Sequence, residues 1–404
     1  MFEQSAKAHS APSMPVSFIV LIHLAFAFIG AATTLLGVIL PALAARFALD
    51  DAQAGRLFSG QFAGSLVGTF LTERLWKRFG FSATILVGLL IMSGGICAVA
   101  FFDLSGTVLG IFLNGVGIGL VIPTINLLVS AVNPLRAASA LNILNFVWSA
   151  GAMFCPAFVG MLGHLLDIRL PLLALSICLL ILALIQLGFS AKFRNVAFAS
   201  QSQQRPASND SQFIWRTGLA LIIAALLFFC VGAENSLSGW LTAYSLRVQD
   251  GQSSLWTATA TFFWLAFLLG RLFAPLFLRQ IAEPTFVLIC LLIGLVGAAL
   301  LLMPSQYYLI SVGTALAGFG LAPVFPTLFA QFTKHFGESG ATRWLFISST
   351  VGGALMTWFV GFLSTVSGSL RSGLSVSFFC FLAMFFLQAW SISKFRSRPA
   401  HFSL

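Results

Sequence analysis

The side chains best able to do chemistry in this chain are polar groups set inside long apolar runs. Glu234 is the outstanding case, because it is the single acid that falls well inside such a run rather than near its end, in the segment VGAENSLSGWLTAY (231–244). A carboxylate in apolar surroundings can hydrogen-bond a hydroxylated molecule, exchange a proton or pair with a cation. It can equally hold its own helix in place, and the sequence leaves both interpretations open.

Amides and aromatic rings in other apolar runs could bind the same kind of molecule. Asn142, Asn145 and Trp148 are spaced three residues apart, which places them on one face of a helix. Amides suit hydroxyl groups and a flat indole suits the C–H face of a sugar, although hydrogen bonds between helices would explain the same residues. The further candidate binding residues are Gln61, Asn126, Asn235, Trp240, Tyr244 and Trp264.

Catalytic and metal-binding chemistry finds no support in the sequence. There is no recognisable nucleophile–base pair, no cluster of metal-ligating residues and no nucleotide-binding loop. The glycines of 115–119 follow no predicted strand and are expected to allow close helix packing instead. Arg271, near the end of its apolar run, is expected to reach the lipid headgroups or to pair with a helix end. We expect no enzyme activity, no metal and no cofactor.

The elements that position these residues must be membrane helices. Of the 404 residues, 59% are apolar and 8% are charged, and the mean hydropathy is +0.98. A soluble domain is about a quarter charged, and a disordered chain is less apolar. The runs are also too long and too uniform for barrel strands of about ten residues. The composition therefore predicts an all-α membrane protein.

The chain divides into twelve apolar runs, each near the roughly 20 residues that a bilayer core requires. They cover residues 16–45, 53–76, 80–102, 105–132, 137–163, 169–191, 214–244, 254–279, 284–304, 306–332, 340–366 and 371–394. A polar, Ser/Gln-rich segment separates the sixth run from the seventh. The predicted organisation is a cytoplasmic tail (1–15), a six-helix bundle (16–191), a cytoplasmic linker (192–213), a second six-helix bundle (214–394) and a second cytoplasmic tail (395–404).

The two halves repeat one another at a nearly constant offset. Gly30 matches Gly232 and Gly68 matches Gly270, each 202 residues apart. The groups Gly115–Pro123 and Gly318–Pro326, and Phe158–Gly160 and Phe359–Gly361, match at 203 and 201 residues. Two parallel six-helix repeats are a common plan for membrane transporters.

The net charge of +10 is explained by topology rather than by nucleic acid. With both termini inside, sixteen of the 21 Lys and Arg residues fall on or near the inner face, as the positive-inside rule requires. We therefore expect a multi-pass protein of the plasma membrane (the bacterial inner membrane) with both termini cytoplasmic. The expected partners are the lipid bilayer and a small-molecule solute, with no nucleic acid, and the expected state is a monomer.

The repeat and one loop resemble the major facilitator superfamily. The loop GTFLTERLWKRFG (68–80) carries Glu73, Arg74, Lys77 and Arg78 where the superfamily has an acid, a base and a basic pair. Its glycine spacing departs by one residue and its second glycine is replaced. The resemblance implies a cytoplasmic latch that breaks during alternating access, while ordinary inner-face charge would explain the same four residues.

Shorter motifs resemble the fucose and glucose/galactose permease branch of that superfamily. They are CVGAENSLSGWLTAY (230–244), LFSGQFAGSLVGT (57–69) and Pro123–Asn126. The resemblance implies sugar uptake coupled to protons or to another cation. Gly37 and Ile122 stand where that branch carries acids, which leaves Glu234 as the candidate for proton coupling.

These observations favour a secondary active transporter that works by alternating access and imports a small hydroxylated, sugar-like solute, and they leave proton coupling open. The alternative is an efflux antiporter for lipophilic or cationic compounds, which the aromatic content of 14% and the single membrane acid would also suit. Organic anions are among the other solutes that the sequence leaves open.

The topology can be tested with reporter fusions. We expect a reporter inserted within 192–213, or fused to either terminus, to show the activity of a cytoplasmic location, because the inner-face charge fixes that orientation. A fusion in 192–213 that reports the outer side would contradict the map of twelve spans.

Overall fold

The protein is described by a computed structural model that covers residues 15–132, 137–163, 167–190, 214–248, 257–303, 307–336 and 341–395. The helices are α1 (Val16–Phe47), α2 (Asp51–Phe79), α3 (Phe81–Phe101), α4 (Leu104–Val132), α5 (Ala137–Leu162), α6 (Arg169–Ser190), α9 (Gly218–Val248), α10 (Ala258–Phe277), α11 (Glu283–Leu301), α12 (Tyr307–Leu321), α13 (Val324–Phe336), α14 (Ala341–Ser367) and α15 (Leu370–Phe395). The predicted linker 192–213, residues 1–14 of the first tail and residues 396–404 of the second lie outside the described residues.

The all-α membrane fold predicted from composition is confirmed, and the helices follow the twelve predicted runs in order. The predicted run 306–332 is built from two helices, α12 and α13. In the described ranges, eleven helical stretches are long and apolar enough to cross a membrane, and α2 is not among them. Because α2 packs against α4 on one side and α14 on the other, protein covers much of the surface that its polar residues would otherwise present to lipid.

Local chemistry fixes where α2 begins and ends. Asp50 Oδ1 accepts a hydrogen bond from the Gln53 N–H at 2.7 Å, and Gln53 Oε1 accepts one from the Asp50 N–H at 3.0 Å. This reciprocal cap satisfies two of the free donors at the helix start. At the other end Gly80 takes a φ of 88°, a conformation that favours glycine, and the chain turns into α3.

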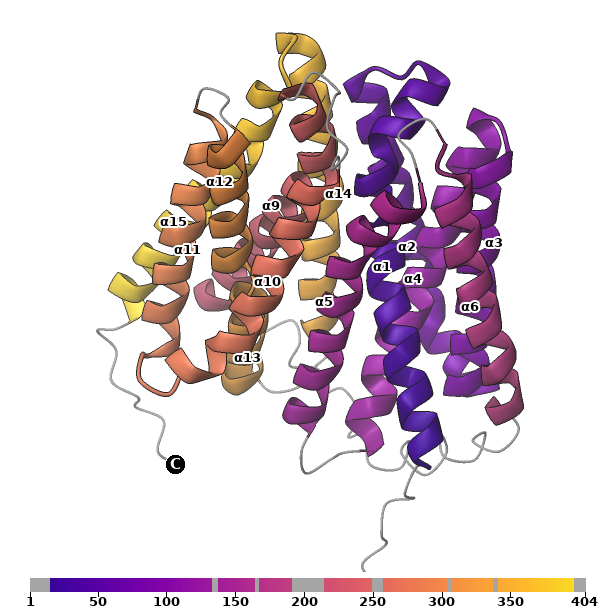
Figure 1. Cartoon of the computed structure of the whole chain (residues 1–404). Helices are drawn as coiled ribbons and strands as arrows, with labels where there is room; N and C mark the ends of the chain where they lie inside the picture. Colours follow the sequence, from indigo (N-terminus) through magenta and orange to yellow (C-terminus); the bar gives the residue numbers. More distant parts are fainter. Residues whose placement is uncertain are drawn as a thin grey trace, which may run out of the picture.

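The helices form two groups that lie side by side, with α1–α6 in one and α9–α15 in the other (Figure 1). In the described part of the chain, the most extensive contacts between the groups are those of α1 with α9, α2 with α14, and α5 with α10. These helices are therefore the first place to look for a site shared by the two groups.

Glycines allow close packing inside each group, and the contacts recur in both. A Cβ placed on Gly95 of α3 would lie 2.6 Å from the carbonyl oxygen of Gly110, and one on Gly297 of α11 would lie 2.6 Å from that of Gly313. Further matching contacts are Gly115 on Gln61 with Gly318 on Phe263, Gly151 on Ala27 with Gly352 on Phe228, and Gly68 on Val116 with Gly270 on Phe319. Each pair is separated by 201 to 203 residues, which supports the internal repeat.

Prolines interrupt the hydrogen-bond ladder at matching places in the two groups. Pro123 of α4 has no N–H to offer the carbonyl of Gly119, and Pro326 has none for the carbonyl of Ala322. Thr72 Oγ1 donates to the Gly119 oxygen at 3.0 Å, which restores its partner. Helix α4 continues through its proline, whereas the second group breaks into α12 and α13 around Ala322.

The glycine packing can be tested on α2 with a matched pair of substitutions. Gly64→Ala should lower the thermal unfolding midpoint of the detergent-purified protein, because the added Cβ would collide with the Phe112 carbonyl oxygen. Overpacking of this kind costs about 1–3 kcal/mol. Gly60→Ala is the control, since a Cβ at Gly60 meets nothing within 4 Å. Equal unfolding midpoints for the two variants would contradict the packing described.

Candidate functional site

Arg271 of α10 lies at the contact between the two groups of helices. Its Nη1 donates to Ser149 Oγ of α5 at 2.8 Å and to the carbonyl oxygen of Asn145 at 3.4 Å. Its Nε donates at 3.4 Å to the Ala322 oxygen, the carbonyl that Pro326 leaves without a helical partner. One guanidinium therefore joins α5, α10 and the break between α12 and α13.

Aromatic rings surround this guanidinium. Its Cζ lies 4.6 Å from the ring centroid of Phe267 and 5.8 Å from that of Trp148. Trp264 meets Trp148 edge to face at 5.7 Å and Phe267 at 5.2 Å. A cation over such ring faces is stabilised by the ring quadrupole. The Nε1 atom of Trp148 is buried and has no hydrogen-bond partner within the described ranges.

Glu234 of α9 completes the site. Its side chain is partly exposed, and no hydrogen bond or ion pair joins it to another described residue. Its charge interacts with that of Arg271, although the two groups are not in ion-pair contact. The charge of Glu234 also acts on the buried thiol of Cys230, one helical turn earlier. We call the following set the Arg271 cluster: Asn145, Trp148, Ser149, Glu234, Trp264, Phe267 and Arg271.

Three of the predicted asparagines share one arrangement. Each is partly buried and donates its amide N–H to a carbonyl of its own helix, four residues earlier. The pairs are Asn126 with Ile122 at 2.8 Å, Asn145 with Leu141 at 2.9 Å and Asn235 with Val231 at 2.9 Å. An amide that donates in this way keeps its Oδ1 as an acceptor. Asn145 belongs to the cluster and Asn235 adjoins Glu234 in the sequence, whereas Asn126 lies on α4 and makes no hydrogen bond to the cluster among the described residues.

The polar atoms of two other predicted binding residues form hydrogen bonds within the protein. Trp240 Nε1 donates to the Thr357 oxygen at 3.0 Å, and the Tyr244 hydroxyl donates to the Leu301 oxygen at 3.0 Å. Both side chains are buried, at 1% and 3% exposure. Such groups join helices and offer a solute little.

Gln61 and Asn142 also lie apart from the cluster. Gln61 is buried and its Nε2 donates to the Thr33 oxygen at 3.4 Å. Asn142 is exposed, one helical turn before Asn145.

On the sequence alone, Arg271 was placed at a helix end and left out of the binding set. Its i, i+4 spacing from Phe267 was a usable signal, but the partners from α5 could only come from the structure.

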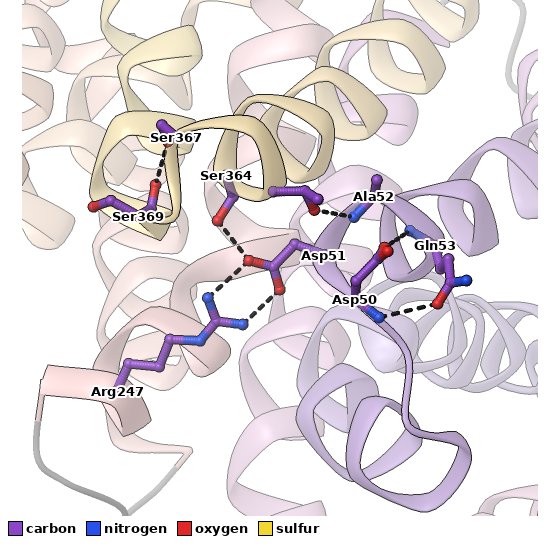
Figure 2. A network of polar contacts seen from close by, with 9 residues as sticks. Asp50, Asp51, Ala52, Gln53, Arg247, Ser364, Ser367 and Ser369 are labelled. Atoms are coloured by element: carbon purple, nitrogen blue, oxygen red, sulfur yellow. Dashed lines mark hydrogen bonds and ion pairs between the residues drawn. The ribbon is translucent and has the colours of Figure 1, made fainter.

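A second polar network joins the two groups at the beginning of α2, which we call the Asp51 end (Figure 2). Arg247 of α9 binds Asp51 with both guanidinium nitrogens, Nη1 at 2.8 Å and Nη2 at 2.5 Å. Ser364 Oγ of α14 donates to the same carboxylate at 2.5 Å. The Ala52 N–H donates to Thr365 Oγ1 at 2.9 Å. These contacts tie α2 to α9 and α14.

The Asp51 carboxylate lies just outside the predicted span 53–76 and is 12% exposed, whereas the Arg247 side chain is 50% exposed. Partial burial by itself raises the pKa of Asp51. The hydrogen bonds from Arg247 and Ser364 and the positive charge of Arg247 outweigh this effect, so the pKa lies below its ordinary value of 3.8. Asp51 is therefore charged at neutral pH and holds Arg247 in place.

Tight apolar packing lies behind the Asp51 network. The Trp240 ring would lie 2.8 Å from a Cβ on Gly361, and its centroid lies 6.3 Å from that of Phe58. A Cβ on Gly55 of α2 would lie 3.1 Å from the Trp358 oxygen of α14. The α2–α14 contact thus closes the Asp51 end.

The predicted latch residues lie at the opposite end of α2. Lys77 Nζ and Glu73 Oε1 are 2.5 Å apart, a local i, i+4 ion pair whose side chains are about half exposed (52% and 49%). Arg74 and Arg78 are exposed as well. A latch between the two groups at these residues stays a prediction. Within the described ranges, no group of three or more His, Cys, Asp or Glu side chains could hold a metal ion.

Known proteins resemble this chain over most of its length. It is 24% identical over 316 residues to the glucose/mannose transporter GlcP of Bacillus subtilis, covering 74% of this chain and 76% of that protein. It is 22% identical over 415 residues to the L-fucose-proton symporter of Escherichia coli, covering 91% and 90%. The 4-hydroxybenzoate transporter PcaK of Acinetobacter baylyi is 30% identical over 133 residues, covering 33% and 27%.

Solved structures share the fold. A bacterial homologue of the human lysosomal transporter Spinster, in an inward-facing and unoccupied conformation, has a TM-score of 0.74 at 14% identity, covering 96% of this chain and all of that one (100%). The transporter FucP in the outward conformation has a TM-score of 0.61 at 19% identity, covering 95% and 99%.

The family model of the Major Facilitator Superfamily matches residues 22–355, which include most of both helix groups. This match and the relatives confirm the resemblance inferred from the loop 68–80 and from the segment 230–244. The relatives are transporters and not enzymes. The chain is a multi-pass membrane protein that belongs to the Major Facilitator Superfamily of transporters.

Proposed function

We propose that the protein imports a small ring-shaped, hydroxylated solute together with protons, that the Arg271 cluster binds the solute, and that Glu234 carries the coupled proton. One observation carries this proposal. Glu234 has no hydrogen-bond or ion-pair partner among the described residues, and its charge interacts with that of Arg271, which lies among aromatic rings at a contact between the two helix groups.

The groups around Arg271 suit a hydroxylated ring. The Oδ1 atoms of Asn145 and Asn235 and the carboxylate of Glu234 can accept hydrogen bonds from hydroxyl groups. The Trp148 Nε1 is a buried donor that needs an acceptor. The ring of Trp148 is partly exposed and can offer apolar area to the C–H groups of a ring, whereas Phe267 is buried behind Arg271. GlcP and the L-fucose-proton symporter support this solute class, since both are named for sugars.

Alternating access requires the two ends of the protein to open in turn. We infer that the Asp51 end faces outward, because the opposite end carries the excess of Lys and Arg. The structure would then be the conformation that is closed outside, with the Asp51–Arg247–Ser364 network as its outer lock.

The export of lipophilic cations is the second candidate function, because an unpaired membrane carboxylate can bind a cation. Arg271 counts against it. A cationic solute at Glu234 would lie close to a second positive charge, which is unfavourable in a medium of low dielectric constant.

The outer lock can be tested by removing its charges. Asp51→Asn should shift the equilibrium toward the conformation that is open at the Asp51 end, by about fivefold, since a partly exposed ion pair contributes about 1 kcal/mol. Arg247→Gln should act similarly, and the double variant should add little to either change. Spin-label distances between positions 102 and 367 measure the shift in a background without reactive native cysteines.

Asp50→Asn is the matched control for the lock, because asparagine still caps α2 and the Asp50 side chain bonds Gln53 instead of Arg247.

The lock should also depend on pH. Since the pKa of Asp51 is lowered in the closed state, the lock is fully present well above pH 3.8 and weakens as the pH falls through the lowered pKa. Distances that are unchanged in Asp51→Asn would refute the lock.

Proton coupling can be tested with Glu234→Gln, which keeps the shape and hydrogen bonding of the side chain but removes its titration. Among the described residues, the group whose charge affects Glu234 is Arg271. We expect the variant to exchange solute by counterflow and to lose accumulation driven by an imposed pH gradient. The measurement is uptake into liposomes of whichever probe the parent protein binds, among D-glucose, L-fucose, D-glucuronate and 4-hydroxybenzoate.

Glu283→Gln is the control for this experiment, because Glu283 is the first residue of α11 and lies outside the Arg271 cluster. If Glu234→Gln accumulates solute as well as the parent protein does, the proton is carried elsewhere. Loss of counterflow as well would make Glu234 a solute ligand or a structural group.

A further inference from the structure

Arg271 carries a positive charge that the described part of the protein does not neutralise. It lies within the candidate span Ala258–Phe277, where an unpaired charge is costly. Its hydrogen-bond partners are one hydroxyl and two carbonyl oxygens, all of them neutral. The ion pairs found among the described residues are Lys77–Glu73 and Arg247–Asp51, so Arg271 has no carboxylate in contact.

The guanidinium also has N–H groups that make no hydrogen bond to the described residues. Nε and Nη1 make the three hydrogen bonds, whereas Nη2 has no partner among the described side chains and carbonyls. A guanidinium presents five N–H groups in a planar fork that matches the two oxygens of a carboxylate. The buried Nε1 of Trp148 is a further donor beside it, because the Trp148 ring lies 5.8 Å from the guanidinium carbon.

The surrounding rings favour an anion that is itself ring-shaped. Phe267 and Trp264 are almost fully buried, at 1% and 2% exposure, and support Trp148, which is partly exposed and can present its ring to a solute next to Arg271. These contacts stabilise the cation but leave its charge uncompensated. Glu234, the acid whose charge acts on Arg271, lies beyond ion-pair contact.

Charge balance then distinguishes between solutes. If Glu234 carries the coupled proton, as the proposed function holds, it is neutral in the loaded state and the cluster has one net positive charge. A neutral sugar would leave that charge unpaired in the bilayer, whereas a carboxylate on the solute would neutralise it. We propose that the solute is a ring that bears both a carboxylate and hydroxyl groups, with its carboxylate bound by Arg271 and a hydroxyl directed to Glu234 or Asn145.

Two kinds of molecule have this chemistry, a sugar acid and a hydroxylated aromatic acid. The sugar transporters among the relatives suggest the first kind. PcaK, whose named solute carries both groups on a benzene ring, suggests the second. The proposal rests on the proposed function and specifies the substrate class of the same site.

Binding of matched acid and neutral pairs to the purified protein tests the proposal. The probes are D-glucuronate against D-glucose and 4-hydroxybenzoate against 4-hydroxybenzamide, measured by calorimetry or by thermal shift. We expect the acid to bind at least about tenfold more tightly in one pair, since the hydrogen bonds concerned are charge-assisted. The pair in which this occurs identifies the kind of ring.

Substitutions then assign the preference to one residue. Arg271→Gln should abolish the preference for the acid, and Arg271→Lys should retain part of it because the charge remains. Arg279→Gln is the control, since it removes the same charge beyond the end of α10 and should keep the preference. If Arg271→Gln does not fold, Arg271→Lys decides the question: because lysine keeps the charge but loses the planar fork, the acid should bind more weakly than to the parent protein while binding of the neutral compound stays the same.

The proposal fails if both neutral compounds bind as tightly as their acids, or if Arg271→Gln keeps the preference. Its failure is distinguishable from that of the proposed function. If D-glucose accumulates in a way that depends on Glu234 and neither acid binds, the proposal of a carboxylate on the solute is wrong, while proton-coupled import still holds. Binding of a hydrophobic cation in place of all four probes would overturn both.

Discussion

A carbonyl oxygen inside a bilayer has no water to bind, and much of this structure depends on how two such oxygens find donors. Prolines in α4 and at the start of α13 each remove one helical hydrogen bond. In the first group the freed Gly119 oxygen is bound by Thr72 and, at 3.5 Å, by Thr69. In the second group the freed Ala322 oxygen is bound by Arg271. The need for a donor therefore places a guanidinium at the interface.

The fold was largely predictable because its signals are long and redundant. Apolar runs of about 20 residues, separated by charged or turn-forming residues, predicted the order of the helices, and glycine matches at about 202 residues predicted contacts that the helices make. The break between α12 and α13 was not predicted, because one proline does not by itself decide whether a helix bends or breaks. Pro123 is accommodated within α4, whereas the second group carries Pro323 in addition to Pro326.

The site was less predictable, since burial and partners depend on tertiary contacts. Asn145, Trp148 and Trp264 were predicted as binding residues and do lie around Arg271, with which the charge of Glu234 interacts, while Trp240 and Tyr244 join helices through carbonyl oxygens. A polar residue in an apolar run signals a need for a partner, but not whether that partner is a solute or a neighbouring helix. Arg271 was missed because its nearest partners come from α5 and from the helix break.

Thr69 and Arg271 occupy equivalent positions in the two repeats, 202 residues apart, and each donates to the carbonyl that its own group's proline has freed. A hydroxyl is enough for that task, as the first group demonstrates. The guanidinium is longer and charged, so after binding Ala322 it still reaches Ser149 in the other group. If the repeats descend from one ancestral half, divergence at this single position replaced a side chain that binds a carbonyl of its own half with one that also binds the other half. Arg271 would then mark a point at which the two repeats diverged after the duplication.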